Sequence, residues 1–178
     1  MNEDWEQLEL ARAGDETAWR MLFQRHYGPL VKMTSCIVGL VDPARDIVQE
    51  CFVRLLHCKI KHRDGTFRSF LSTMAYRLAL KEKGRRNTNR RIGDLDVIDD
   101  APSPLEEAIR NENDRRIVRV IQSLPDHHRE IVALRFFSGH SYEEIAVITG
   151  IPIGTVKSRI FHAIKSCKVK LQERETSL

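Results

Sequence analysis

Apolar residues recur along most of this chain at steps of three and four, which is the spacing of one face of an α-helix. Strict β-strand alternation occurs nowhere, so the sequence predicts an all-α protein. We expect a kink or local break at Gly28-Pro29, because proline removes a helical hydrogen bond, and fraying after Gly84. Before the last thirty-odd residues the pattern predicts helices over residues 3–13, 15–31, 42–56, 67–84, 114–124 and 125–137.

Residues 141–170, SYEEIAVITGIPIGTVKSRIFHAIKSCKVK, contain two short helical patterns separated by a glycine turn. Ser141 and Glu144 have the spacing of a capping box, in which each side chain bonds the other residue's backbone N–H. Gly150 can take the left-handed conformation that ends a helix, and Pro152 suits the first turn of the next. Such a pair of helices predicts a helix-turn-helix that reads duplex DNA in the major groove. The second helix should bury Val156, Ile160, Ala163 and Ile164.

The charge pattern of this second helix supports a nucleic-acid partner. Acidic residues are absent between Glu144 and Glu173, an interval that contains five cations, Lys157, Arg159, Lys165, Lys168 and Lys170. DNA phosphates repel carboxylates and favour basic runs through counterion release. A solvated amphipathic helix in an ordinary bundle is the alternative, but it would not explain why cap, turn and charge agree.

A second basic stretch lies in the first half of the chain. Residues 59–67 read as a basic loop with a glycine turn, and basic and aromatic residues flank the apolar stripe of the helix that follows. Aromatic rings beside a basic stripe suit single-stranded nucleic acid, whose bases stack on them. The alternative is that Phe67 and Phe70 pack in the core, and the sequence leaves both interpretations open.

The middle of the chain changes character. Residues 92–113 are acidic, contain Pro102 and Pro104, and show no long apolar period. This composition predicts a flexible acidic linker. We therefore expect two small helical domains, residues 1–91 and residues 114–178, with the helix-turn-helix in the second.

The overall composition is typical of a soluble globular protein. The 178 residues are 42% apolar and 30% charged, with a net charge of +4 and a pI of about 9.0. The four cysteines form no C-x-x-C pair, which disfavours a disulfide framework and a zinc site. We also expect no metal at the one cluster of possible ligands, Cys51, His57, Cys58 and His62. Without a signal region or a bilayer-spanning apolar run, the protein should be cytoplasmic, with reduced thiols.

The sequence carries no motif of catalysis. It has no P-loop, no dinucleotide-binding glycine motif, no G-x-S-x-G and no H-E-x-x-H. No pair of acidic residues stands out from the surface charges as a general acid and base. We therefore expect neither an enzyme nor a bound cofactor.

Three strings of the sequence resemble the extracytoplasmic-function (ECF) group of bacterial sigma factors, in the sigma-70 family. LPDHHREIVALRFFSGHSYEEIAVITGIPIGTVKSRIFHAIKSCK, residues 124–168, is similar to their promoter-reading C-terminal domain. DPARDIVQECFVRLL, residues 42–56, resembles the segment that docks on core RNA polymerase. FRSFLSTMAYRLAL, residues 67–80, resembles the helix that reads the minus-10 element. The resemblance covers most of the chain in the family's order.

The resemblance implies a factor that binds core RNA polymerase, directs it to promoters and assists promoter melting. It also implies an anti-sigma protein that covers the polymerase-binding and DNA-binding surfaces. Contact with the clamp helices of the largest polymerase subunit would involve Asp46, Gln49, Glu50 and Arg54. Readout of the duplex minus-35 element would involve Thr155, Lys157, Ser158, Arg159, Phe161, His162 and Lys165. Binding of the single-stranded minus-10 element, with a base flipped into the loop of residues 59–67, would involve Lys61, His62, Arg63, Phe67, Arg68, Phe70, Tyr76, Arg77, Lys81, Arg85 and Arg86.

Three residues depart from the family's usual pattern. The family often has Trp at Phe70, Asn at Arg77 and Arg at His162. Arg77 cannot offer the acceptor of an Asn side chain, and His162 replaces a permanent charge with a group that titrates near neutrality. The promoter sequence recognised by the family therefore does not carry over.

Two other functions are weighed against a sigma factor. A transcription regulator that binds duplex DNA alone would explain the helix-turn-helix. Two-component response regulators, however, commonly have His at the position of Arg159, and they add an α/β receiver with no counterpart here. A nucleic-acid enzyme that uses the helix-turn-helix for targeting would need a carboxylate or metal cluster, which the sequence does not show.

Overall fold

The computed structural model describes residues 3–58, 65–92, 117 and 119–175. Within these ranges the chain is helical and contains no strand, which confirms the all-α prediction. Residues 119–122 also form part of a helix, just before α7. The other helices are α1 (Glu3–Arg12), α2 (Glu16–Val38), α3 (Val41–His57), α4 (Phe67–Ile92), α7 (Asp126–Phe136), α8 (Tyr142–Thr149) and α9 (Ile153–Glu175).

Helix α2 begins and ends as local sequence rules require. The carboxylate of Asp15 accepts hydrogen bonds from the backbone N–H groups of Thr17, at 2.8 Å, and Ala18, at 3.1 Å. Gly39 ends the helix with a φ of 87°, a left-handed conformation that glycine adopts at little cost. The predicted N-cap at Asp15 is confirmed.

The predicted local break at Gly28-Pro29 and the predicted fraying after Gly84 are wrong, while the alternative of a kink at Pro29 stays a prediction. Helix α2 continues through Pro29, because Leu22 before the proline and Leu30 after it are buried in the same core. This packing outweighs the roughly 3 kcal/mol that an internal proline costs. Helix α4 likewise continues through Gly84 to Ile92, since one glycine costs only about 1 kcal/mol and Lys83 is anchored to α7.

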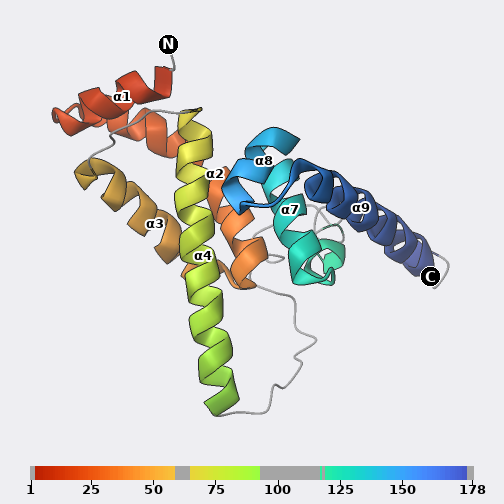
Figure 1. The fold of residues 1–178 in the computed structure, drawn as a ribbon. Coiled ribbons are helices and arrows are strands. Elements are labelled where there is room, and N and C mark those ends of the chain that lie inside the picture. The colour runs from red at the N-terminus through yellow and green to blue at the C-terminus, as the bar shows by residue number, and fades with distance from the viewer. Residues whose placement is uncertain (1–2, 59–64, 93–116, 118, 176–178) are drawn as a thin grey trace.

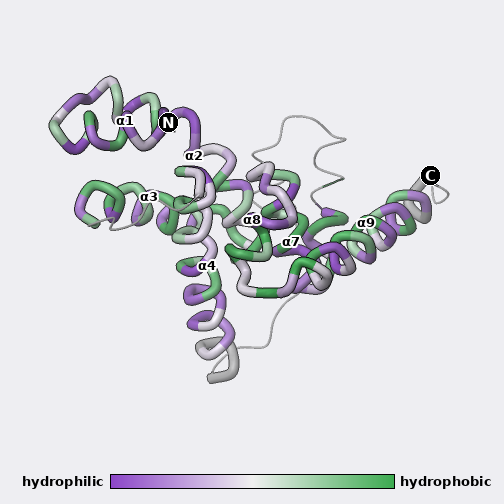
Figure 2. Tube along the Cα trace, turned by 45° about the horizontal axis from the view of Figure 1, so that its top comes forward, coloured by the Kyte–Doolittle hydropathy of each residue, from purple (hydrophilic) through white to green (hydrophobic). Residues whose placement is uncertain are grey.

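Helix α4 stands upright at the centre of the view in Figure 1. Helix α3 lies on one side of it and α8 on the other, and α2 contacts α1, α3, α4 and α7. The C-terminal part of α4 projects beyond the other helices (Figure 1), and the tube is mostly hydrophilic before its grey tip (Figure 2). Lys81 and Arg85 of this part are exposed to solvent.

The C-terminal half is built as the helix-turn-helix pattern predicts. The hydroxyl of Ser141 accepts from the N–H of Glu144, at 3.1 Å, and the Glu144 carboxylate accepts from the N–H of Ser141, at 2.9 Å. Gly150 ends α8 with a φ of 71°. The capping box and the glycine turn are both confirmed.

The two halves of the chain share one continuous core. Helix α7 packs against α2, and Ala133 and Leu134 of α7 belong to the same buried cluster as Met33 and Ile37 of α2. His140, in the loop after α7, is fully buried against α4, where its Nε2 lies 2.8 Å from Oγ of Ser72. The structure therefore adds something that the sequence does not predict, a closed arrangement of the two domains.

Candidate nucleic-acid and polymerase interfaces

Helix α9 presents the predicted duplex-reading residues to solvent. Val156, Ile160 and Ala163 are buried against α7 and α8, which fixes the rotation of the helix. Thr155 and Arg159 are half-buried at the edge of the exposed face. The exposed residues of this face are Lys157, Ser158, Phe161, His162 and Lys165. These five residues, together with Thr155 and Arg159, form one surface, which we call the α9 face.

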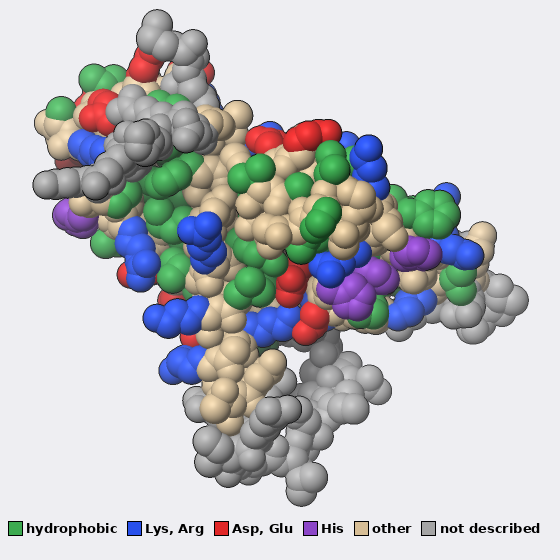
Figure 3. All heavy atoms as spheres, in the orientation of Figure 1, with side chains coloured by type: hydrophobic (Ala, Val, Ile, Leu, Met, Phe, Trp, Pro, Cys, Tyr) green, Lys and Arg blue, Asp and Glu red, His purple; other side chains and the backbone are tan. Residues whose placement is uncertain are grey.

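Aromatic rings lie on the α9 face and continue beyond it onto α7. The ring of Phe161, which is 65% exposed, lies 5.4 Å from that of His162. His128 at the start of α7 lies parallel to His162, with ring centroids 6.5 Å apart, and His127 is 4.3 Å from His128. Figure 3 shows histidines gathered beside lysine and arginine side chains in this part of the molecule. Burial lowers the pKa of His128, and nearby His127, His162 and Arg159 lower it further.

The residues of helix α4 that are predicted to bind single-stranded DNA differ in their exposure to solvent. Arg68, Arg77, Lys81 and Arg85 are exposed, and Arg86 is half-buried. Tyr76, by contrast, is only 6% exposed, because α7 covers it in the closed arrangement. The predicted basic surface therefore exists, but its aromatic member at position 76 is covered.

The two phenylalanines at the start of α4 lie against α1. Phe67 is 0% exposed, and its ring meets that of Trp5 edge to face with 5.0 Å between centroids. Phe70 is half-buried, 5.4 Å from the same indole. Phe67 is therefore a core residue in this arrangement, whereas for the half-buried Phe70 both interpretations stay open. Lys61, His62 and Arg63 lie outside the described residues.

Helix α3 presents a mixed-charge face on the opposite side from its core contacts. Ile47, Val48, Cys51, Phe52 and Leu55 are buried. Arg54 donates from Nε to Oε1 of Glu50, one turn earlier, at 2.7 Å. All four predicted polymerase-binding residues, Asp46, Gln49, Glu50 and Arg54, are exposed, and we call this surface the α3 face.

Two of the four thiols, those of Cys36 and Cys51, are buried in the hydrophobic core. Burial raises the pKa of Cys36 and of Cys51 to about 12, so both remain protonated near neutral pH. Cys58 is half-buried, with its Sγ 3.7 Å from Nη2 of Arg12. All four cysteines are free, and no group of three potential metal ligands occurs among the described residues. His62 of the suggested cluster is outside those residues.

Comparison with known families matches both halves of the chain. "Sigma-70 region 2" matches residues 22–89, and "Sigma-70, region 4" matches residues 114–167. The ECF RNA polymerase sigma-E factor of Escherichia coli is 34% identical over 180 residues, which cover 93% of this chain and 92% of the relative. The chain belongs to the ECF sigma factors. The RNA polymerase sigma-H factor of Pseudomonas aeruginosa is 29% identical to this sigma factor over 182 residues, which cover 96% of this chain and 94% of the relative.

Solved structures share the fold of this sigma factor. CnrH in complex with the cytosolic domain of CnrY has a TM-score of 0.68 at 21% identity, covering 97% of this chain and 99% of CnrH. RpoE in complex with the anti-sigma factor NepR, from Bartonella quintana, has a TM-score of 0.63 at 19% identity, covering 86% of this chain and 96% of RpoE. No helix in the described part of the chain is long and apolar enough to cross a membrane.

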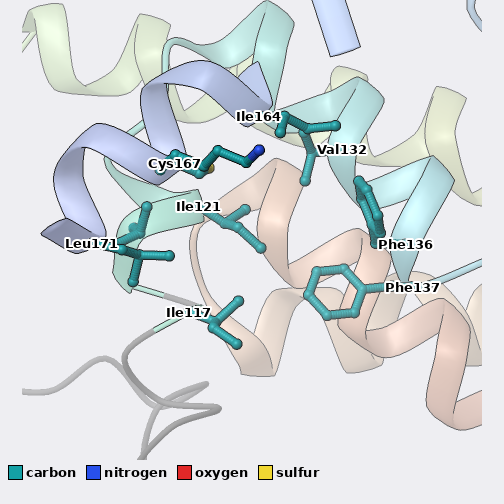
Figure 4. A pocket seen from close by; sticks show the side chains of 10 residues that line it. Ile117, Ile121, Val132, Phe136, Phe137, Ile164, Cys167 and Leu171 are labelled. Carbon is teal, nitrogen blue, oxygen red and sulfur yellow. The ribbon is translucent and has the colours of Figure 1, made fainter. Parts of the chain in front are cut away.

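The sigma factor also has an apolar hollow that the sequence patterns do not predict. It measures about 250 Å³ and lies between α7, α9 and the side chains of Ile117, Val120 and Ile121 (Figure 4). Ile164 lines it instead of packing in the helix-turn-helix core as expected, and it is joined there by Cys167 and Leu171. The spacing of these three residues by three and four along α9 is the signal that could have indicated a second apolar face.

Proposed function

We propose that this sigma factor uses three separate surfaces, the α3 face for core RNA polymerase, α4 for the minus-10 strand and the α9 face for the minus-35 duplex. ECF sigma factors direct RNA polymerase to promoters, and the proposal concerns how this chain divides that task. Residues 1–91 would hold the first two surfaces and residues 114–178 the third, with residues 92–113 as the connection. A factor that binds core RNA polymerase would act where the polymerase is, in the cytoplasm.

The observation that carries the proposal is the α9 face. Its buried side fixes the helix so that Lys157, Ser158 and Phe161 point outward together. Lysine and serine can donate to base edges or phosphates, and an exposed aromatic ring can contact the methyl group of thymine. The exposed cations of α4 supply a second, separate site for phosphates.

Lys157→Ala tests the α9 face. If Lys157 bonds a base edge, binding to a minus-35 duplex should weaken by about 1–3 kcal/mol, and the loss should depend on the sequence at that position. If it contacts only phosphate, the loss should be similar on all duplexes and the salt slope should fall by about one. Fluorescence anisotropy over a salt series distinguishes the two results.

The matched control is Lys168→Ala, which removes an equal charge from an exposed position further along α9. It should change duplex affinity much less, because Lys168 lies beyond the α9 face. Equal losses in both variants, or no loss from Lys157→Ala, would remove Lys157 from the interface.

The α3 face is tested by competition for core RNA polymerase. The unmodified chain should displace a labelled housekeeping sigma factor from core enzyme at nanomolar concentration. Glu50→Lys should weaken this displacement at least tenfold, about 1.4 kcal/mol, because it reverses the charge of the α3 face and breaks the Glu50–Arg54 pair.

Glu6→Lys, at an exposed position on α1, is the control for the change in net charge. It should compete as well as the unmodified chain. Equal competition by Glu50→Lys would argue against the α3 face. No displacement by the unmodified, folded chain would favour a regulator that binds duplex DNA without polymerase.

We also infer that an anti-sigma protein binds this chain. The support is that one of the relatives of the same fold, RpoE of Bartonella quintana, was solved with an anti-sigma factor. The apolar hollow of Figure 4 would accept one or two aliphatic side chains of a partner helix, because Ile117, Ile121 and Leu171 line it. A structure of the chain with its inhibitor checks this placement.

A further inference from the structure

Acidic side chains of the C-terminal domain occupy the minus-10 surface of α4 in the closed arrangement. Asp126 and Glu130 of α7 contact the middle of α4, and Glu144 of α8 contacts its beginning. These contacts join residues that lie tens of positions apart in sequence. They bring carboxylates to the helix that the proposed function assigns to a phosphate-bearing strand.

Glu130 is the centre of this contact. Its Oε1 accepts from Nζ of Lys83 at 3.0 Å, and its Oε2 accepts from the Tyr76 hydroxyl at 3.1 Å. The Glu130 side chain is only 14% exposed, and Asp126 pairs with the same ammonium at 2.7 Å. A carboxylate that bridges a lysine and a tyrosine satisfies the groups that a DNA phosphate would otherwise meet.

The Tyr76 hydroxyl keeps its proton in this contact. Burial raises the pKa of the hydroxyl, and the charge of Glu130 raises it further, while Arg159 of α9 acts in the opposite direction. Tyr76 therefore remains a hydrogen-bond donor to Glu130 near neutral pH.

Glu144 forms a second point of contact between the domains. It accepts from the hydroxyl of Thr66 at 3.2 Å and lies 3.4 Å from Nη2 of Arg68, in addition to its capping-box bond. Burial alone would raise its pKa, but the Ser141 N–H and the charges of His140 and Arg68 outweigh burial and lower it. The Glu144 carboxylate is therefore charged at neutral pH, as an ion pair with Arg68 requires.

We propose that Glu130, supported by Asp126 and Glu144, is an intramolecular latch that holds the free sigma factor closed and keeps the minus-10 surface from DNA. This inference rests on the proposed function of α4. The latch competes with the DNA strand for Tyr76 and Arg68, and it pairs with Lys83, a further cation of the same helix. The apparent DNA affinity of the free chain is then reduced by the fraction of molecules that are open.

Glu130→Gln tests the latch, since it keeps the size of the side chain and removes its charge. Binding of a short fluorescein-labelled single-stranded DNA of mixed sequence to the free chain should strengthen about tenfold, because the variant populates the open form. Small-angle X-ray scattering of the same sample should show a larger radius of gyration.

Glu143→Gln is the matched control. Glu143 is an exposed carboxylate of the same domain, and within the described residues it has no contact with α4. The control should leave affinity and radius of gyration near those of the unmodified chain, although it changes the net charge equally. Equal strengthening by both variants, or none by Glu130→Gln, would overturn the latch.

Lys83→Gln removes the ion pairs of Lys83 with Glu130 and Asp126 from the α4 side and provides a second, independent readout. It should also enlarge the radius of gyration, and an unchanged radius in both Glu130→Gln and Lys83→Gln would contradict the proposal even if one variant folded poorly. Competition for core polymerase by the unmodified chain is measured separately. If the unmodified chain does not compete, the proposed function is contradicted. If it competes but Glu130→Gln changes neither DNA affinity nor radius of gyration, only the latch is contradicted.

Discussion

Phe67→Ala should lower the free energy of unfolding by about 3–5 kcal/mol. The ring is completely buried, packs edge to face on Trp5 and lies 5.2 Å from the imidazole of His26. Its removal would open a cavity at the junction of α1, α2 and α4. Urea denaturation followed by circular dichroism measures the change.

The control for this prediction is Phe161→Ala, which removes the same side chain from an exposed position on α9. It should change stability by no more than about 0.5 kcal/mol, yet weaken binding to the minus-35 duplex. The two variants thus separate a ring that holds the fold from one that faces DNA. A stable Phe67→Ala protein with impaired DNA binding would return Phe67 to the nucleic-acid interface.

Acidification should destabilise the closed fold as the pH falls below about 6.5, through the buried histidines His26 and His140. Burial lowers the pKa of His26, against the attraction of Asp4. Burial also lowers the pKa of His140, with Glu144 opposing and Arg68 adding to the effect. Below the ordinary value of 6.5 the unfolded chain takes up protons that the folded chain resists. Each histidine can then remove up to about 1.4 kcal/mol per pH unit.

Urea denaturation between about pH 7.5 and about pH 5.5 measures this dependence. The carboxylates of Asp126 and Glu144, whose pKa values are lowered, add their own loss of stability only at still lower pH. His140→Gln and His26→Gln should each flatten the pH dependence relative to the unmodified chain. Equal slopes in all three proteins would show that neither histidine is responsible.

The sequence predicted the helices and most of their ends, because caps and turns are local. Asp15, Ser141 with Glu144, and Gly150 each act within a few residues of their own position, so their roles follow from residue type and spacing. The α9 face was predictable for the same reason, since one helix period separates its buried residues from its exposed cations. Local rules failed at Pro29 and Gly84, where contacts with distant helices stabilise a continuous helix.

Only the tertiary structure showed which aromatic residues of α4 are buried in the closed arrangement. Helical spacing gives Phe67 and Tyr76 the same character, and neither the packing of Trp5 on Phe67 nor the bond from Tyr76 to Glu130 can be read from spacing. The closed arrangement of the domains likewise depends on pairings between distant residues, such as Lys83 with Glu130 and Ser72 with His140. The sequence by itself therefore determined the family, most of the helices and most of the division of α9 into a buried and an exposed side. The burial of Tyr76 beside α7 required the fold, because burial is a property of the whole set of packed helices and not of any one segment.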